Sequence, residues 1–347
     1  MGTYLTLLVI VMVGLMSQCS ESSSALPPVV KGLSYNFYSS SCPKLEAIVR
    51  GHLAKVFKQD ITQSAGLLRL HFHDCFVQGC DGSVLLDGSA SGPSEQNAPP
   101  NLSLRPQAFQ IINDLRALVQ RTCGRTVSCA DLTALAARDS VYLSGGPYYD
   151  IPYGRRDSLN FASTAVTLAN LPSPKSDTTT LLNALGNKKL DPTDVVALSG
   201  GHTIGRGHCT SFTDRLYPTQ DSTIEQTFAK NLKVTCPTLN TDNTTVLDIR
   251  TPNKFDNQYY VDLVKGQGLF TSDQTLFTDS RTRGIVSSFA TNQSLFFEKF
   301  VNAILKMGQL GVLTGAQGEI RANCSARNGN DFGLFSVVED DQHKGSL

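Results

Sequence analysis

A chain of 347 residues with 40% hydrophobic and 17% charged residues is long enough for one large globular domain or two smaller ones. Its 30 basic and 30 acidic residues leave no formal net charge, and no cluster of Lys and Arg is interleaved with aromatic residues. Composition therefore gives no support to nucleic-acid binding.

The N-terminal segment has the pattern of an export signal. Residues 5–16 form an apolar run that is too short to span a bilayer, and polar residues follow it. We predict a signal peptide over residues 1–25, with cleavage between residues 20 and 32, although no Lys or Arg precedes the apolar run. An exported chain of this kind is expected to have no stable membrane association.

Two helices are expected next. Apolar residues recur at helical spacing over residues 45–59, where His52 is expected to be a surface or capping residue. A second helix is expected over Ala65–Cys75, with Arg69 and His73 four residues apart and so on one face. This arrangement places a proton acceptor beside a fixed positive charge.

After Cys75 the helix is expected to end in a tight loop. Glycines and the closely spaced Cys75 and Cys80 favour such a turn, and Asp74, Asp81 and Ser83 offer hard oxygen ligands. The pattern therefore predicts a calcium loop directly behind an acid/base helix.

The stretch from Arg69 to Ser83 reads Arg-Leu-His-Phe-His-Asp-Cys-Phe-Val-Gln-Gly-Cys-Asp-Gly-Ser. It resembles the distal haem and calcium signature of the secretory plant (class III) haem peroxidases. The resemblance implies a mainly α-helical fold of roughly ten or more helices in two packed halves, with one haem b between them and two calcium ions. The implied activity is reduction of hydrogen peroxide with one-electron oxidation of small phenolic donors, including lignin oxidation and hydrogen peroxide catabolism under oxidative stress.

The same resemblance assigns roles within the motif. His73 would be the distal acid/base catalyst, Arg69 would stabilise developing negative charge, and Phe72 would cover the iron. The first calcium ion would take its oxygen ligands from the turn and from one later glutamate, namely Asp74, Val77, Gly79, Asp81, Ser83 and Glu95.

Asn101 follows in an irregular, proline-containing segment and resembles the distal asparagine of the family. Its side-chain carbonyl would accept the Nδ1 proton of His73 and keep Nε2 free as a base. Asn101-Leu-Ser is also a glycosylation sequon, but a buried catalytic role excludes a glycan, and we favour the catalytic role.

Helices are expected over residues 108–123 and 128–143, the second with Ser128 as its N-cap. The resemblance implies a structural ion pair between Asp131 and an arginine of residues 154–157. It also places Pro172 in the substrate-lining loop at the exposed haem edge.

The second centre lies at His202. Asp191-Pro192 begins a helix, Gly200-Gly201 is expected to end it, and His202 lies just beyond. A histidine held at a helix terminus suits a neutral imidazole ligand, and His202 resembles the proximal haem ligand. Asp273 would be its hydrogen-bond partner and would raise its basicity.

The resemblance also implies a second calcium site beside His202. Its ligands would be side-chain oxygens and one backbone carbonyl, from Thr203, Asp248, Thr251, Lys254 (carbonyl) and Asp256.

Two helices over residues 283–291 and 295–310 are expected to complete a haem peroxidase domain of residues 26–328. Asn243, Asn292 and Asn323 stand in plausible glycan sequons. Residues 329–347 form an acidic extension that resembles vacuolar sorting propeptides, with a disordered tail as the alternative. We therefore expect a secreted cell-wall or apoplastic protein, with the vacuole as the other destination.

Eight cysteines remain once Cys19 is assigned to the leader, and an even number in an exported chain suggests four disulfides. The residues alone leave the connectivity open. The family resemblance implies the pairs Cys42–Cys123, Cys75–Cys80, Cys129–Cys324 and Cys209–Cys236.

Two other classes of protein compete with a monomeric haem peroxidase. A secreted zinc hydrolase could use His71, His73 and Asp74 or His202, but two histidines two residues apart face different sides of a helix, and the chain has no HExxH pattern. A calcium-stabilised wall-binding protein could keep the fold without activity. Retention of Arg69, His73, Asn101, His202 and Asp273 argues against that alternative.

Overall fold

The computed structural model describes residues 26–88 and 93–329. The predicted signal peptide lies outside the described residues, as does the predicted C-terminal extension beyond Gly329. Within the described ranges the protein is mainly helical, with twelve α-helices, short 3-10 turns and one two-stranded antiparallel sheet. The predicted fold class is confirmed.

The α-helices in chain order are α2 (Leu45–Gln59), α3 (Gln63–Val77), α4 (Pro106–Cys123), α5 (Cys129–Leu143), α6 (Thr164–Asn170), α7 (Thr178–Gly186), α8 (Pro192–Ser199), α9 (Gln226–Thr235), α10 (Gln258–Val264), α11 (Thr271–Thr278), α12 (Ser280–Thr291) and α13 (Gln293–Met307). Strands β1 (Arg206–His208) and β2 (Thr244–Val246) pair with Gly207 opposite Thr245. The 3-10 turns nearest the candidate site are η1 (Ser83–Leu85), η2 (Glu95–Asn97), η3 (Pro99–Asn101) and η4 (Gly200–Thr203).

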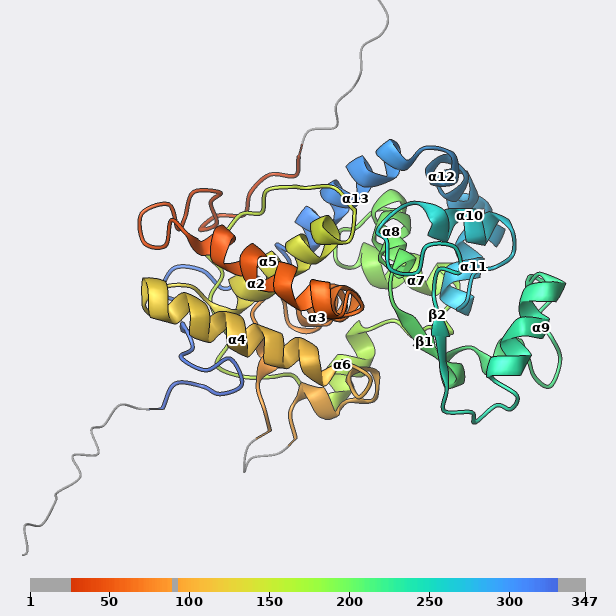
Figure 1. The fold of residues 1–347 in the computed structure, drawn as a ribbon, viewed down its shortest axis with the longest axis horizontal. Coiled ribbons are helices and arrows are strands. Elements are labelled where there is room, and N and C mark those ends of the chain that lie inside the picture. Colours follow the sequence, from red (N-terminus) through yellow and green to blue (C-terminus); the bar gives the residue numbers. More distant parts are fainter. Residues whose placement is uncertain (1–25, 89–92, 330–347) are drawn as a thin grey trace, which may run out of the picture.

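The helices gather in two halves. Figure 1 shows α2 to α6 on one side and α7 to α12 with the small sheet on the other, while α13 returns between them. Helix α3 packs mainly on α5, α8 packs on α13, and α13 also contacts α3. One large hydrophobic cluster includes residues from both halves, and a smaller one lies between α9 and the sheet.

Periodicity and capping explain the helices that the sequence predicted. In α2 the buried side chains are Leu45, Val49, Leu53 and Phe57, which recur every four residues along one face. Helix α5 begins as expected, because the Ser128 hydroxyl accepts a hydrogen bond from the Asp131 amide. These boundaries agree closely with the prediction.

Helix α3 is longer than expected. It runs from Gln63 to Val77 instead of ending at Cys75. The break comes at Gly79, whose φ of 139° lies in the region that favours glycine. A Cβ there would lie 2.5 Å from the carbonyl oxygen of Gly311. Glycine is therefore required by conformation and by close packing together.

Several short elements were not predicted from the sequence, namely α6, α7, α9, α10, α11 and the two strands. They are 3 to 10 residues long, so periodicity in the sequence is a weak signal for them. The last two helices were predicted with shifted ends, because α12 begins at Ser280 and α13 ends at Met307.

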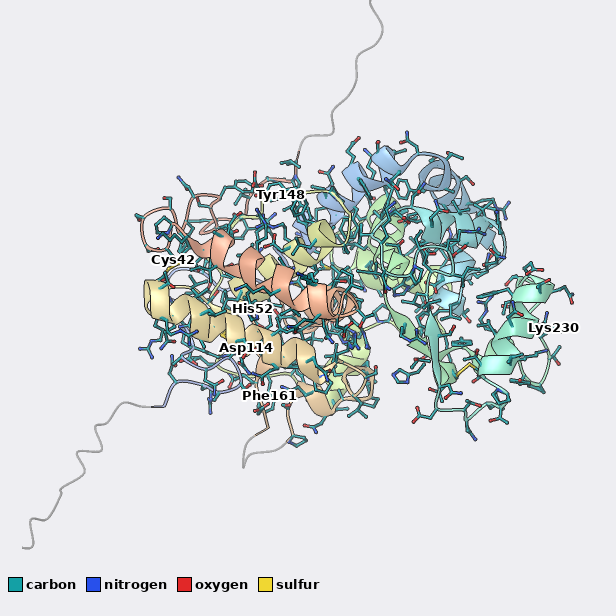
Figure 2. All side chains as sticks on the ribbon, in the orientation of Figure 1. Cys42, His52, Asp114, Tyr148, Phe161 and Lys230 are labelled. Atoms are coloured by element: carbon teal, nitrogen blue, oxygen red, sulfur yellow. A yellow bond between two sulfur atoms is a disulfide. The ribbon has the colours of Figure 1, made fainter. Side chains whose placement is uncertain are left out.

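The expectation for His52 was wrong in part. It lies in the middle of α2, so it is not a capping residue, and it is only half-exposed. Figure 2 shows it in the first half together with Asp114 of α4. Burial lowers the pKa of His52, with a smaller opposing effect of the Asp114 charge.

Four disulfides link the expected partners. The sulfur atoms of each pair lie at bonding distance, in Cys42–Cys123, Cys75–Cys80, Cys129–Cys324 and Cys209–Cys236. Cys129–Cys324 joins α5 to the end of the described chain, across 195 residues.

A buried ion pair ties α5 to the loop after it, as predicted. Arg155 Nη1 lies 2.8 Å from Asp131 Oδ1, and neither side chain is more than 2% exposed. Asp131 Oδ2 also accepts from the Tyr38 hydroxyl and the Gly154 amide. Arg155 donates further to the carbonyl of Gly308, after α13.

We expect Asp131→Ala to lower the free energy of unfolding by about 3–5 kcal/mol, because it leaves the buried Arg155 charge without its partner. Chemical denaturation followed by circular dichroism measures this loss. The control is Lys175→Ala, which breaks an exposed pair with Asp214 and should cost less than about 1 kcal/mol. Equal losses in the two variants would contradict the structural role of Asp131.

Candidate active site

Helix α3 presents Arg69 and His73 on one face, as their spacing predicted. Arg69 Nε donates to His73 Nε2 at 3.1 Å. His73 is only 4% exposed. A base and a permanent cation are therefore in direct contact in a mostly buried position.

The Asn101 side chain determines the tautomer of His73. Asn101 Nδ2 donates to the Glu95 carbonyl at 2.8 Å, which identifies the amide nitrogen and leaves Oδ1 facing His73. Oδ1 lies 2.6 Å from His73 Nδ1, so Nδ1 carries the proton and Nε2 carries the lone pair. With both ends of its amide engaged and only 3% exposed, Asn101 cannot accept a glycan in this fold.

One expectation about His73 needs correction. We expected Nε2 to be free, but its lone pair accepts the Arg69 Nε hydrogen bond. The atom is unprotonated, as a base must be, but it can take a proton only if Arg69 moves or shares its hydrogen bond.

Arg69 is anchored by η3 and by the segment that follows it. Nη1 donates to the Ser103 carbonyl at 2.9 Å, and Nη2 donates to the Pro100 carbonyl and to the Ser103 hydroxyl, each at 3.0 Å. Together with the bond to His73, four of the five N–H groups of the guanidinium donate to described residues. The guanidinium therefore has a defined position next to His73.

Burial and charge together keep His73 neutral. Desolvation, followed by the Arg69 charge, lowers the pKa of His73 to about 3, although the Asn101 hydrogen bond acts in the opposite direction. Desolvation also lowers the pKa of Arg69 to about 10, which still leaves it charged at neutral pH. The pair thus combines a neutral base with a stable cation.

Behind His73, the structure buries a group of carboxylates. Asp74 is completely buried and Asp81 nearly so, while Glu95 of η2 completes the group. Burial, with the charge of Asp81 next, raises the pKa of Asp74 well above its usual value, and burial raises that of Glu95 to about 7. Asp74 Oδ1, Ser83 Oγ and Glu95 Oε2 have no hydrogen-bond partner among the described residues.

Helix α8 leads to the second histidine. Asp191 and Asp194 form a capping box at its start, and Pro192 is its first residue. Beyond Ser199 the chain continues into the η4 turn, so His202 lies within a 3-10 turn and not after a glycine stop. Gly200 is needed for packing, because a Cβ there would lie 2.3 Å from the Tyr260 hydroxyl.

His202 is paired with Asp273 at the start of α11. Nδ1 of the imidazole lies 2.7 Å from Asp273 Oδ1, and the carboxylate is 2% exposed whereas the His202 side chain is 40% exposed. Since a carboxylate only accepts, Nδ1 donates, and in a neutral imidazole this leaves the lone pair at Nε2. The rings of Tyr259 and Phe270 stand edge-on to the imidazole, at 6.1 and 5.5 Å between centroids.

Helix α3 lies against the segment that carries His202. A Cβ added at Gly201 would lie 3.5 Å from Leu68 Cδ2, and one at Gly205 would lie 3.1 Å from Ala65 Cβ. Leu68 and Ala65 belong to the same helix as Arg69 and His73. The two histidines therefore come from neighbouring elements of the two halves.

Next to His202 the expected second oxygen cluster is assembled. The Thr203 hydroxyl lies 3.0 Å from Asp248 Oδ2 and 3.4 Å from both the Lys254 carbonyl and Asp256 Oδ1. The Thr251 hydroxyl lies 2.9 Å from Asp256 Oδ1. Both carboxylates are buried.

The residues of the zinc alternative do not converge. His71 lies beside the Cys75–Cys80 disulfide, with Nδ1 3.5 Å from Cys75 Sγ, whereas His73 is engaged by Arg69 and Asn101. The only compact group of possible metal ligands among His, Cys, Asp and Glu in the described ranges is His71, Cys75 and Cys80. Its two sulfurs are already bonded to each other, so the group is not a metal site.

Phe72 and Pro172 were also predicted to lie at the site. The Phe72 ring is half-buried and stands edge-on to His73, with 5.2 Å between centroids. Pro172 is half-buried in the loop after α6, and this loop is joined to α11 by a hydrogen bond from the Ser272 amide to the Pro174 carbonyl. The substrate role of Pro172 stays a prediction.

Three further residues contribute to the site, and no sequence pattern predicted them. Ser103 anchors Arg69, Tyr259 donates to Asp273 Oδ1 at 3.0 Å, and Arg215 holds the loop before α11 through the carbonyls of residues 268–270. Each acts on a residue distant in the sequence, so no local pattern identifies it.

Comparison with known proteins decides the family. The family model described as Peroxidase matches residues 49–292, a range that includes Arg69, His73, His202 and Asp273. The chain belongs to the peroxidase family. This confirms the resemblance inferred from the motif around His73.

Named plant peroxidases are similar over nearly the whole chain. Peroxidase 12 of Arabidopsis thaliana is 64% identical over 313 residues, which cover 90% of this chain and 87% of the relative. Cationic peroxidase SPC4 of Sorghum bicolor is 56% identical over 326 residues, covering 92% and 90%. This protein is thus a peroxidase, and the family implies a haem cofactor.

We expect the reaction of this peroxidase with hydrogen peroxide to depend on pH through His73. A base must be unprotonated, and the pKa of His73 is about 3, so the rate constant should stay level from neutral pH downwards and fall only near that value. In Arg69→Leu the pKa of His73 should rise, because a neighbouring positive charge is removed, and the fall should begin at higher pH. Stopped-flow mixing with peroxide measures both profiles, and coincident inflections would contradict the electrostatic coupling.

Proposed function

We propose that this peroxidase binds one haem b through His202 and reduces hydrogen peroxide with His73 and Arg69, oxidising two phenolic donor molecules in turn. The observation that carries the proposal is the different setting of two imidazoles. His73 Nε2 faces a cation, whereas His202 donates through Nδ1 to a buried carboxylate. The first setting suits proton transfer to a small substrate, and the second suits metal ligation.

The residues present fit a haem. His202 combines an engaged Nδ1 with a partly exposed side chain, so Nε2 is available to iron. Asp273 increases the basicity of the imidazole, as carboxylate partners of ligating histidines do. When bound, the haem would supply the iron at which peroxide is reduced and would hold the two oxidising equivalents taken from peroxide until the donors consume them.

The chain supplies the proton transfer. Once Arg69 Nε releases or shares its hydrogen bond, His73 Nε2 accepts a proton from hydrogen peroxide and returns it to the departing oxygen, which leaves as water. Arg69 stabilises the negative charge that develops while the O–O bond breaks, and Asn101 holds the imidazole in the tautomer that this transfer requires. A positioned acid/base of this kind contributes about 10²–10⁴-fold to a rate.

For the donors, the proposal places oxidation at the haem edge near Pro172, with small phenols, including lignin precursors, as the class of donor. Two molecules each give one electron. Phe72 restricts access to the iron, so that peroxide enters and larger molecules do not.

We also propose two calcium ions. The distal one would be bound by Asp74, Val77, Gly79, Asp81, Ser83 and Glu95. Its charge would offset a group of buried carboxylates that has unpartnered oxygens. The proximal one would be bound by the oxygen cluster of Thr203, Asp248, Thr251, Lys254 and Asp256. Converging carboxylate, hydroxyl and carbonyl oxygens are the ligands that calcium prefers.

Export to the cell wall or apoplast completes the proposal, with the vacuole as the alternative. Four disulfides are typical of an oxidising compartment. Asn243, Asn292 and Asn323 are exposed and remain the expected glycan sites. No helix in the described ranges is long and apolar enough to cross a membrane. We expect a monomer.

We expect His73→Ala to retain haem but to react with hydrogen peroxide about 10²–10⁴-fold more slowly, because it loses only the proton acceptor. His202→Ala should instead fail to retain haem. Visible absorption of the Soret band, before and after one equivalent of peroxide, measures haem retention and reaction together.

The matched control for these variants is His52→Ala, which removes a half-buried histidine of α2 that belongs to neither site. It should keep the wild-type spectrum and rate. An undiminished reaction of His73→Ala would remove that residue from its role, and a haem-loaded wild type that ignores peroxide would favour an inactive binding protein.

We expect calcium to stabilise the protein more strongly at about pH 8 than at about pH 5. The folded-state pKa of Glu95 is about 7 against an ordinary value of 4.5, so without calcium the folded state binds more protons between these values. Stability then falls as pH rises through that range, and Asp74 contributes in the same direction. Bound calcium should remove this loss.

Melting temperatures with calcium or with a chelator, at the two pH values, measure the difference. Magnesium at the same concentration is the ion control, and Glu95→Gln should reduce the pH dependence of the chelated protein. A calcium effect that is equal at both pH values would contradict the link to the distal carboxylates.

A further inference from the structure

Helix α10 contributes two consecutive buried tyrosines to the neighbourhood of His202. The Tyr259 hydroxyl donates to Asp273 Oδ1 at 3.0 Å, and the Tyr260 hydroxyl donates to the carbonyl of Val196 in α8 at 2.8 Å. Both side chains are at most 2% exposed. The two hydroxyls are therefore alike in burial but differ in the acceptor that they contact.

The Asp273 carboxylate receives three hydrogen bonds. Oδ1 accepts from His202 Nδ1 at 2.7 Å and from the Tyr259 hydroxyl, while Oδ2 accepts from the Phe270 amide at 2.8 Å. His202 and Tyr259 thus share one oxygen atom. Burial, with the Asp273 charge next, raises the pKa of Tyr259 well above 10.0, so the phenol keeps its proton and is the donor.

The second oxygen of the Asp273 carboxylate, Oδ2, is held by a loop that Arg215 fixes. Arg215 is 3% exposed, and its Nη1 donates to the carbonyls of Gly268, Leu269 and Phe270. This guanidinium, which also pairs with Asp221, fixes the loop whose Phe270 amide binds Oδ2. Asp273 therefore has little freedom to turn Oδ1 away from either of its two donors.

We propose that Tyr259 is a positioning residue whose hydroxyl draws negative charge from Asp273 Oδ1 and so limits the electron donation of His202 to a bound metal. The inference rests on the proposed haem site. Two donors at one oxygen compete for the same lone-pair density, and each makes the oxygen a weaker acceptor for the other. Without Tyr259, the bond to His202 Nδ1 strengthens and the imidazole gains anionic character.

The effect of the Tyr259 hydroxyl can be tested separately from the effect of its ring. The rings of Tyr259 and Phe270 stand at 87° and 80° to the imidazole and confine it from two directions. Phenylalanine at position 259 keeps the ring and removes only the hydrogen bond. The orientation of His202 should then persist while its electronic character changes.

The test is the ferric/ferrous midpoint potential of haem-loaded Tyr259→Phe, together with the iron–histidine stretching band in the resonance Raman spectrum of the ferrous protein. A more anionic imidazole favours ferric iron. The equilibrium should shift toward the ferric state by up to about tenfold, which is about 59 mV for one electron. The stretching band should move to higher frequency.

The matched control is Tyr260→Phe, which removes a buried hydroxyl from the same helix and leaves the three donors of Asp273 in place. Its melting temperature should fall comparably, but its potential should match the wild type. In an Asp273→Asn background, Tyr259→Phe should no longer lower the potential, because the shared charged oxygen is gone.

An unchanged potential in haem-loaded Tyr259→Phe would overturn the inference while leaving the haem site intact, and so would equal shifts in the Tyr259 and Tyr260 variants. If Tyr259→Phe does not fold, 3-fluorotyrosine placed at position 259 is a stronger donor and should raise the potential. A fall or no change there would overturn the inference. A wild-type protein without a Soret band would overturn the haem site and this inference with it.

Discussion

Helix α3 is buried on nearly all sides, and the polar groups that it carries into the interior must find partners there. Arg69 donates hydrogen bonds to the carbonyls of Pro100 and Ser103, and His73 donates one to Asn101. Asp74 is matched only in part, because one oxygen accepts the Gly82 amide and the other has no partner among the described residues. Residues 100–103 supply these partners to the face of α3 that carries Arg69 and His73.

Each half of the structure contributes one of the two imidazoles, and the two have different surroundings. On α3, burial and a neighbouring cation keep His73 neutral, and Asn101 leaves its lone pair at Nε2. In the other half, Asp273 accepts a hydrogen bond from Nδ1 of His202. Gly200 has no Cβ, so α8 and α10 can approach closely enough for the Tyr260 hydroxyl to donate to the Val196 carbonyl. The two histidines differ in burial, in neighbouring charge and in hydrogen-bond partners.

Much of this could be predicted from the sequence where the signals were local. The spacing of Arg69 and His73 placed them on one face, and Ser128 and Asp191 marked helix starts correctly. Local sequence signals failed to predict features that depend on tertiary packing. Helix α3 continues past Cys75 until Gly79 meets Gly311, His52 lies mid-helix, and Gly200 is required by contact with Tyr260 and not as a helix stop. The helices α6, α7, α9, α10 and α11 are too short for periodicity to identify, since tertiary contacts stabilise them more than their own sequences do.

By itself, the sequence determined the helical class and the pairing of a histidine with a cation on α3, and through the family motif it predicted both histidines and the two groups of oxygen-bearing residues. These features follow from residue identity and short spacing, which are present in the sequence before the chain folds. Only the tertiary structure decided that Arg69 occupies the lone pair of His73, that Ser103 holds Arg69, and that Tyr259 shares an Asp273 oxygen with His202. Those contacts join residues 4 to 71 positions apart. Their hydrogen bonds depend on distances of about 3 Å, which only the packed arrangement of helices can set.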